Sequence, residues 1–231
     1  MRNFFVTGTD TDVGKTFVAC ALIAAFRARG LRVEPMKPIA AGTVTVNGIE
    51  ANSDVLALRE VSASTAALSD TNPYCFARPI APHLAARDAG VVVDMSTICA
   101  AFERLNIAAD SVIVEGAGGF LVPLSDQQSM AEIPRLLALE VILVVGMRLG
   151  VINHALLTVE AIASRGLTLA GWVANSPLAS STMLAFDENI ATLTALIPAP
   201  LLGVVPFSGA AGSAVEHAQR AARHLQIQTL L

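Results

Sequence analysis

The sequence predicts an α/β fold in which a mostly parallel β-sheet is flanked by helices on both faces. Hydrophobic residues make up 54% of the 231 residues and charged residues only 15%, a composition typical of strands buried on both faces. Apolar, β-branched runs also alternate with helical patterns along the chain, as successive βαβ units with right-handed crossovers require. A chain of this length can bury one sizeable core, so we expect residues 1–231 to form a single domain.

The expected strands and helices follow one another in an almost regular order. Apolar, β-branched runs predict strands at residues 4–6, 31–35, 111–115, 141–145, 167–174 and 201–205. Helical periodicity predicts helices at residues 16–29, 54–60, 95–105, 130–139, 152–164 and 183–196, and the stretch from Ala210 predicts a closing surface helix. Loops are expected at residues 40–52, 70–82 and 207–213. Because open α/β sheets bind ligands beyond the carboxyl ends of their strands, we search those ends for chemistry.

Charge, hydropathy and cysteine content argue against several classes of partner. The net charge is −4 without a basic stripe, which argues against nucleic acid as a partner. The most apolar region, residues 136–146, contains Glu140 and is too short to span a membrane. The first strand begins so early that we expect no signal peptide. Three widely spaced cysteines, Cys20, Cys75 and Cys99, indicate reduced thiols and a cytoplasmic protein.

Gly14, Lys15 and Thr16 form the clearest functional motif, because they follow an apolar strand and open a helix. This is the context of a phosphate-binding P-loop and predicts a P-loop NTPase fold. Loop N–H groups and the helix N-terminus would bind phosphate oxygens, Lys15 would lie between the β- and γ-phosphates, and the Thr16 hydroxyl would bind Mg²⁺. The usual spacing requires glycine where Thr9 stands, and Gly8 lies one residue earlier. A bare Gly-Lys-Thr also arises by chance, but the strand and helix around it favour a nucleoside triphosphate site.

Polar side chains follow three further strands and begin one helix. Lys37 would lie beside the P-loop if the strands are neighbours, or would be a solvated surface lysine. Glu115 precedes a glycine cluster and resembles a Walker-B acid that holds Mg²⁺, with an exposed strand-end acid as the alternative. Asn175 would contact an adenine edge or form a turn, and Asp54 would be a first-turn acid or a second Mg²⁺ carboxylate. The spacing of the four histidines is not that of metal ligands; they are His83, His154, His217 and His224.

Seven short motifs occur in an order and spacing that resemble one known family. They are GTDTDVGKT (8–16), KP (37–38), NSD (52–54), NPY (72–74), EGAGG (115–119), GVINHA (150–155) and GWVAN (171–175). From residue 4 to about residue 206 the chain is similar to the dethiobiotin synthetases of the biotin pathway. The unusual spacing of the P-loop glycines is that family's own pattern. Only the tail after Pro206 lacks a clear match.

The resemblance implies a reaction and a set of catalytic groups. The family closes a ureido ring on 7,8-diaminononanoate with CO₂ and ATP and releases dethiobiotin, ADP and phosphate. An amine takes up CO₂ as a carbamate, whose oxygen attacks the γ-phosphate, and the second amine attacks the resulting carbamic–phosphoric anhydride. Positioning and charge neutralisation dominate such chemistry. By resemblance, Lys37 and Lys15 are catalytic, and Thr16, Asp54 and Glu115 surround Mg²⁺.

The resemblance also implies binding residues and a homodimer. The substrate carboxylate would be held by residues 149–153 of the neighbouring subunit, where a helix N-terminus suits an anion. The active site would therefore lie at the subunit interface. The implied ATP-binding residues are Asp12, Val13, Gly14, Lys15, Thr16, Phe17, Asp54, Glu115, Gly116, Ala117, Gly118, Asn175, Ser176, Val204, Val205 and Pro206. The implied substrate-binding residues are Thr11, Lys37, Gly118, Leu149, Gly150 and Asn153.

Two positions depart from the family pattern. Ala41 stands where the family carries a hydroxyl that contacts substrate, and Thr43 is the nearest hydroxyl. A lost hydrogen bond costs about 0.5–1.5 kcal/mol, so we expect weaker substrate affinity and retained activity. Asp12 stands where glutamate is frequent, which shortens the reach of that carboxylate.

Two other classes share part of this pattern. Regulatory or partitioning ATPases of the deviant-Walker group carry a signature lysine at the position of Asp10. They also commonly carry a basic surface or a membrane helix, which this sequence does not predict. A cobyrinate-type amide synthase would need a glutaminase domain, for which this chain leaves no room. The dethiobiotin synthetase interpretation is therefore preferred to both.

Overall fold

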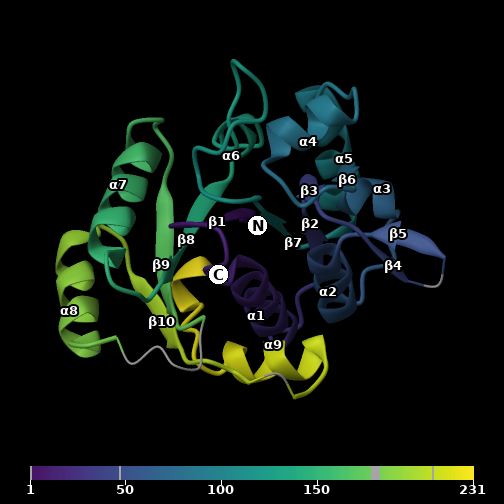
Figure 1. Ribbon diagram of the computed structural model, residues 1–231. Helices are drawn as coiled ribbons and strands as arrows, with labels where there is room; N and C mark the ends of the chain where they lie inside the picture. The colour runs from purple at the N-terminus through teal and green to yellow at the C-terminus, as the bar shows by residue number, and fades with distance from the viewer. Residues whose placement is uncertain (1, 47, 178–182, 210) are drawn as a thin grey trace.

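A six-stranded parallel sheet forms the centre of the computed structural model, which describes residues 2–46, 48–177, 183–209 and 211–231 (Figure 1). The strand order is β10–β9–β8–β1–β7–β2, and every neighbouring pair is parallel. The strands are β1 (Phe4–Gly8), β2 (Val33–Met36), β7 (Ser111–Glu115), β8 (Glu140–Gly146), β9 (Leu169–Asn175) and β10 (Leu201–Val205). All six strands therefore end at the same edge of the sheet.

Helices cover both faces of this sheet, as the sequence predicts. Phe4 and Val6 of β1 pack in the cluster formed with α1, α2 and α9, whereas Phe5 packs in a cluster with α5 and α6 on the opposite face. Leu143 and Val145 of β8 face α7 and α8 on that second face. This alternation follows from the two-residue period of a strand. The helices are α1 (Lys15–Arg27), α2 (Ser53–Ser62), α5 (Met95–Ala108), α6 (Glu132–Leu136), α7 (Val151–Ala163), α8 (Phe186–Leu196) and α9 (Ala214–Ala222).

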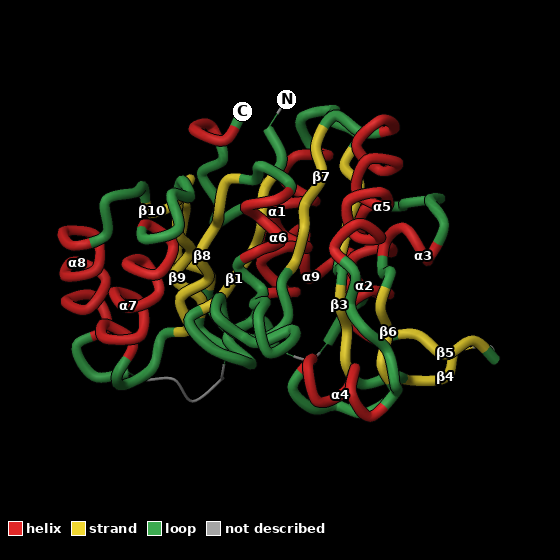
Figure 2. Tube along the Cα trace, turned by 90° about the horizontal axis from the view of Figure 1, so that it is seen from above, coloured by secondary structure: helices red, strands yellow, loops and turns green. Residues whose placement is uncertain are grey.

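The regions expected as loops at 40–52 and 70–82 contain regular structure, so that expectation was wrong in part. Two strands pair in parallel, β3 (Ile39–Ala41) with β6 (Tyr74–Phe76). A hairpin of β4 (Val44–Val46) and β5 (Ile49–Ala51) projects beside them, and its residue 47 lies outside the described residues (Figure 2). Two short helices, α3 (Leu68–Thr71) and α4 (Pro82–Asp88), also belong to this region. Strands of three residues are too short to show a hydrophobic period, which is why the sequence pattern missed them.

Several predicted helix boundaries also shift. The helix expected at 130–139 is the short α6, which contains Pro134 and is followed by Ala138 at φ 51°. Pro134 lies in the first turn of α6, where its missing N–H would have no helical partner, and the left-handed conformation of Ala138 stops the helix from continuing. The closing helix is confirmed as α9, where Ser213 and Glu216 form a capping box. Ala210 and residues 178–182 lie outside the described residues. A 3₁₀ turn, Gln228–Leu230, ends the chain.

The connections place a ligand crevice at the end of β1. From β1 the chain runs through α1 to β2 and leaves a gap between the two strands, which β7 later fills. The chain then adds β8, β9 and β10 on the other side of β1. Such a reversal of direction leaves a crevice outside the carboxyl ends of the strands. Within the ranges that the structure describes, the helices are all too short or too polar to cross a membrane.

Candidate active site

A cleft of about 1060 Å³ lies at the carboxyl edge of the sheet. The loop between β1 and α1 forms its floor, and the ends of β2, β7 and β9 supply polar side chains. Two regions without a motif, around α4 and α9, complete its walls. The predicted site residues that line this cleft are Thr11, Asp12, Gly14, Lys15, Thr16, Phe17, Lys37, Asp54, Glu115, Ala117, Gly118, Asn175 and Ser176.

The loop before α1 has the conformation that an anion site needs. Gly14 precedes the helix with φ 86°, and a Cβ there would lie 2.2 Å from Asn175 Nδ2. Asn175 Nδ2 donates to the Val13 carbonyl at 2.8 Å, which ties the end of β9 to the loop. Since Gly14 supplies no side-chain cap, the first N–H groups of α1 remain available to an anion.

Lys15 is buried over this loop. Its Nζ donates to the Asp10 carbonyl at 2.9 Å, and burial lowers the pKa of Lys15, partly offset by the charge of Glu115. The Asp10 carboxylate accepts from the Thr11 N–H, which is the main reason that its pKa is lowered, and it also pairs with Arg148. Lys15 and Lys37 are the only two lysines in the sequence, and both line the cleft.

Lys37 lies between two carboxylates that come from distant parts of the chain. Its Nζ is 2.6 Å from Glu115 Oε1 and 2.8 Å from Asp54 Oδ2. Thr16 Oγ1 donates to the same Glu115 Oε1 at 2.7 Å, which joins the P-loop to this cluster. Only 4% of Lys37 and 1% of Glu115 is exposed, so the interpretations as a surface lysine and an exposed acid are wrong.

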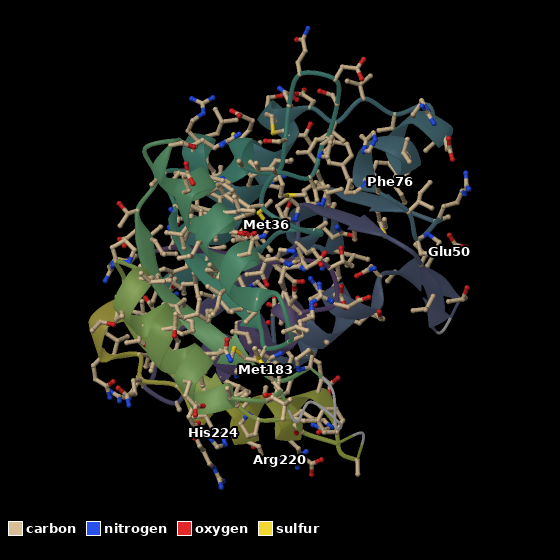
Figure 3. The ribbon with its side chains drawn as sticks, turned by 60° about the vertical axis from the view of Figure 1, so that its left-hand side comes forward. Met36, Glu50, Phe76, Met183, Arg220 and His224 are labelled. Atoms are coloured by element: carbon tan, nitrogen blue, oxygen red, sulfur yellow. The ribbon has the colours of Figure 1, made fainter. Side chains whose placement is uncertain are left out.

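Electrostatics keep Lys37 charged in this position. Burial disfavours the ammonium, but the charges of Glu115 and Asp54 and their hydrogen bonds outweigh it and raise the pKa of Lys37. A buried charge is tolerated only when it is paired and hydrogen-bonded, and the cluster meets both conditions. Figure 3 shows Met36, the residue before Lys37, in the interior of the molecule, whereas Glu50 of the β4–β5 hairpin lies at the periphery.

Asp54 is a first-turn acid of α2, as its sequence position predicts, and it is also paired with Lys37. Asn52 caps α2, because its side chain accepts from the N–H groups of Asp54 and Val55 at 3.0 and 3.4 Å. Asn52 Nδ2 also donates to the Gly42 carbonyl at 2.8 Å, which fixes the start of the helix. As a first-turn acid, Asp54 therefore projects into the cleft and pairs with Lys37.

Asn175 offers one unused acceptor. Its Nδ2 is occupied by the Val13 carbonyl, whereas its Oδ1 is buried and has no hydrogen-bond partner among the described residues. The neighbouring Ser176 N–H donates to the Val205 carbonyl at 3.0 Å. The ends of β9 and β10 are thereby joined at one end of the cleft.

Other predicted binding residues lie behind the cleft or beside it. Val13 contributes its carbonyl to Asn175, and Gly116 packs on Phe5, since a Cβ at Gly116 would lie 2.8 Å from Phe5 Cζ. Val204 and Val205 pack in the core, and Val205 and Pro206 line a smaller neighbouring hollow of about 410 Å³. Their side chains are therefore not part of the main cleft.

The segment around the start of α7 lies outside the cleft lining. Leu149 is 95% exposed, and Gly150 and Asn153 are also exposed. Gly150 has φ 91° and caps α7 without a side-chain hydrogen bond. Ala41 does line the cleft, whereas Thr43 is not among the described residues that line it.

Sequence reasoning missed the walls of the cleft. They come from α2 and its cap Asn52, from the turn before α4, from the loop after β10 and from α9, and only the first of these regions carries a motif, NSD (52–54). Cys20, Val122 and Pro177 come from α1 and from the loops after β7 and β9. A pattern along the chain could not have found them, because the tertiary fold alone brings them to the P-loop. The missed residues are Cys20, Asn52, Ala57, Pro79, Ile80, Ala81, Pro82, Val122, Pro177, Phe207, Ser208, Gly209, Ala214 and His217.

The fold and the loop define a protein of the P-loop NTPase class. Residues 2–213 match the family model described as an AAA domain. The septum site-determining protein MinD of Pyrococcus horikoshii, solved with Mg-ADP, superposes with a TM-score of 0.55 at 16% identity, covering 96% of this chain and 93% of that one. The MinD cell division protein of Aquifex aeolicus gives a TM-score of 0.55 at 15% identity, covering 96% and 87%. At these identities the likeness concerns the fold alone.

Curated relatives give a narrower assignment. The ATP-dependent dethiobiotin synthetase BioD of Aromatoleum aromaticum is 54% identical over 92% of this chain and 94% of its own length. The BioD proteins of Pseudomonas paraeruginosa and Cellvibrio japonicus are 47% and 48% identical, each over 100% of this chain and 98% of its own length. The chain belongs to the dethiobiotin synthetase family.

Proposed function

We propose that this protein is an ATP-dependent cyclo-ligase that converts 7,8-diaminononanoate, CO₂ and ATP into dethiobiotin, ADP and phosphate. The observation that carries this proposal is the buried Lys37, held at 2.6 Å from Glu115 beside the P-loop threonine. Such a lysine can face a transferring phosphoryl group and a second anion at once. The family to which the chain belongs supplies the identity of the substrates.

The phosphates would bind at the P-loop. The unpaired N–H groups at the start of α1 and the ammonium of Lys15 suit the β- and γ-phosphates. Asn175 Oδ1, a buried acceptor without a partner among the described residues, would accept from the adenine amino group. Asp12, Phe17, Ala117 and Gly118 line the same cleft and would complete the nucleotide site.

The residues beside Lys37 fit a magnesium ion. Glu115 Oε2 is buried and has no hydrogen-bond partner within the described ranges, and Thr16 and Asp54 add a hydroxyl and a carboxylate. No cluster of three or more His, Cys, Asp or Glu side chains that could hold a metal occurs in the described residues. Mg²⁺ needs few protein ligands, because water and phosphate oxygens complete its coordination. When bound, Mg²⁺ would neutralise charge on the phosphates.

The chemistry would then need positioning more than acid–base catalysis. One amine of the substrate adds to CO₂ and loses a proton, giving a carbamate. A carbamate oxygen attacks the γ-phosphorus and ADP leaves, with Lys37 held against both anions and Lys15 against the transferring group. The second amine attacks the carbonyl carbon of the mixed anhydride, phosphate leaves with its bonding electron pair, and the ureido ring closes as the attacking nitrogen loses a proton to the departing phosphate. Charge neutralisation of this kind is the main source of catalysis in phosphoryl transfer.

The diamine would lie between Lys37 and the turn before α4. Thr11 and Gly118 line the cleft, together with the apolar residues Ala41, Ile80 and Val122, and would contact the diamine. The start of α7 would bind the substrate carboxylate of a partner subunit, because it is exposed and outside its own cleft. From this arrangement we infer an obligatory homodimer. We also infer that residues 1–231 form a single domain. Three free cysteines favour a cytoplasmic location.

The proposal is tested by product formation. Purified protein is incubated with 7,8-diaminononanoate, bicarbonate, ATP and Mg²⁺, and dethiobiotin is measured by mass spectrometry while ADP is measured in parallel. ADP release should require both the diamine and CO₂, because the carbamate is the nucleophile. Vigorous ATP hydrolysis that is independent of the diamine, without dethiobiotin, would contradict the proposal and favour an ATPase that acts through partner proteins.

A further inference from the structure

The order of the strands indicates which end of the cleft would face the nucleoside. Lys37 follows β2 and Glu115 ends β7, on one side of β1, whereas Asn175 ends β9 on the other side. Under the proposed function the γ-phosphate points toward Lys37. The rest of the nucleotide therefore extends over the P-loop toward the ends of β9 and β10.

That end of the cleft is formed by the loop after β10 and by α9. Phe207, Ser208 and Gly209 come from the loop, and His217 comes from the second turn of α9. The helix is fixed, because Ala218 and Ala221 are buried against α1 and a capping box holds its N-terminus. His217 is thus presented to the cleft by a rigid element.

Hydrogen bonds fix the tautomer of His217. Arg220 Nη2 donates to His217 Nδ1 at 3.1 Å, and Ser208 Oγ lies 2.9 Å from the same nitrogen. A guanidinium has only donors, so Nδ1 must accept, and the ring proton is carried by Nε2. No hydrogen bond of Nε2 occurs within the part of the chain that the structure describes. The imidazole therefore presents one N–H donor that no described residue uses.

We propose that His217 is a specificity-determining residue that donates from Nε2 to a ribose hydroxyl of the bound nucleotide. Ser208 and Arg220 are positioning residues that hold the ring in this tautomer. The inference rests on the proposed ATP site, in which Lys15 and the start of α1 serve the phosphates and Asn175 serves the base. The sugar is the remaining polar part of the nucleotide, and its hydroxyls accept hydrogen bonds.

The test compares nucleotides that differ only in one sugar hydroxyl. Binding of Mg²⁺ with ADP, 2′-deoxy-ADP or 3′-deoxy-ADP is measured by titration calorimetry for the wild type and for His217→Ala. The wild type should bind at least one deoxynucleotide about threefold to tenfold more weakly than ADP, the range expected for one hydrogen bond. His217→Ala should bind ADP more weakly by the same factor and should no longer distinguish the nucleotides.

Two further variants separate the contact from general effects of mutation. His224→Ala changes an exposed histidine beyond the end of α9, outside the main cleft, and should behave as the wild type (Figure 3). Arg220→Met removes the donor to Nδ1 without entering the cleft, and it should weaken the discrimination between ADP and the deoxynucleotides. Melting temperatures measured in parallel verify that each variant is folded.

The outcomes also separate this inference from the proposed function. Equal binding of all three nucleotides by the wild type, or unchanged discrimination in His217→Ala, would overturn the role of His217 while dethiobiotin formation stands. A wild-type protein that binds no ADP would overturn the nucleotide site itself and this inference with it.

Discussion

At the residue scale, the cluster around Lys37 balances desolvation against charge pairing. Lys37 and Glu115 are both almost fully buried, and Asp54, with 40% of its side chain exposed, adds a second negative charge. Removing one partner of a buried pair costs about 3–5 kcal/mol, because the other charge is left uncompensated. We therefore expect substitutions here to affect both stability and catalysis, and experiments must distinguish the two effects.

Lys37→Ala should lower kcat by a factor of at least about 100, the scale of losing one charge-stabilising group. Lys37→Arg should not restore turnover, because a planar guanidinium cannot replace a compact ammonium. The affinity for ADP with Mg²⁺ should change little, since ADP lacks the phosphoryl group that Lys37 would face. Steady-state kinetics and calorimetry measure the two quantities separately. A variant that keeps most of its turnover would show that Lys37 is structural.

At the element scale, the turn into α1 depends on one glycine for two reasons. Gly14 has φ 86°, and its missing side chain leaves room for Asn175 Nδ2, which would lie 2.2 Å from a Cβ. Gly30, after the end of the same helix, has a similar φ of 83°, but a Cβ at Gly30 would meet no atom of the described residues within 4 Å. The two glycines therefore separate backbone strain from close approach.

Gly30→Ala should lower the free energy of unfolding by about 1–2 kcal/mol, the cost of a left-handed conformation for a residue with a Cβ, and should leave ADP affinity unchanged. Gly14→Ala should carry the same strain and also displace Asn175 from the Val13 carbonyl. We expect it to weaken ADP binding by at least about tenfold, as loss of loop geometry at a phosphate site implies. Chemical denaturation and calorimetry check both values. Equal ADP affinity of the two variants would show that the Asn175 contact is not needed.

At the scale of the whole molecule, the start of α7 is exposed and lies outside the active-site cleft of its own chain. Leu149, Gly150 and Asn153 are exposed and do not line the cleft of their own chain. A helix N-terminus without a side-chain cap suits a carboxylate. The proposed dimer would bring this segment to the cleft of the partner.

Asn153→Ala should raise the KM for the diamine, leave the KM for ATP nearly unchanged and keep the protein folded. Mixing this variant with Lys37→Ala and exchanging subunits gives a heterodimer in which one site has both changes and the other has only wild-type residues. Activity at subsaturating diamine should recover toward half that of the wild type. If subunit exchange is proven and no activity recovers, the substrate tail is held within one chain.

The P-loop, the order of the six main strands along the chain and the family could all be predicted from the sequence. Each of these depends on residues that are close along the chain, such as Gly14, Lys15 and Thr16 at the start of α1. Local spacing is enough to predict a strand, a loop and a helix that follow one another, and the order of such units predicts a parallel sheet. The sequence also placed Lys37, Glu115 and Asn175 at strand ends, but left open whether they were buried.

The position of Lys37 between Glu115 and Asp54 follows from the tertiary fold alone. Glu115 is 78 positions away from Lys37, and the pairing of β2 with β7 brings their ends together. The same holds for His217, which reaches the cleft because α9 packs on α1. Burial and pairing depend on the register of strands and the packing of helices, which involve residues far apart in the chain. The sequence determines which chemical groups are present, whereas the distances between them are determined only when the chain folds.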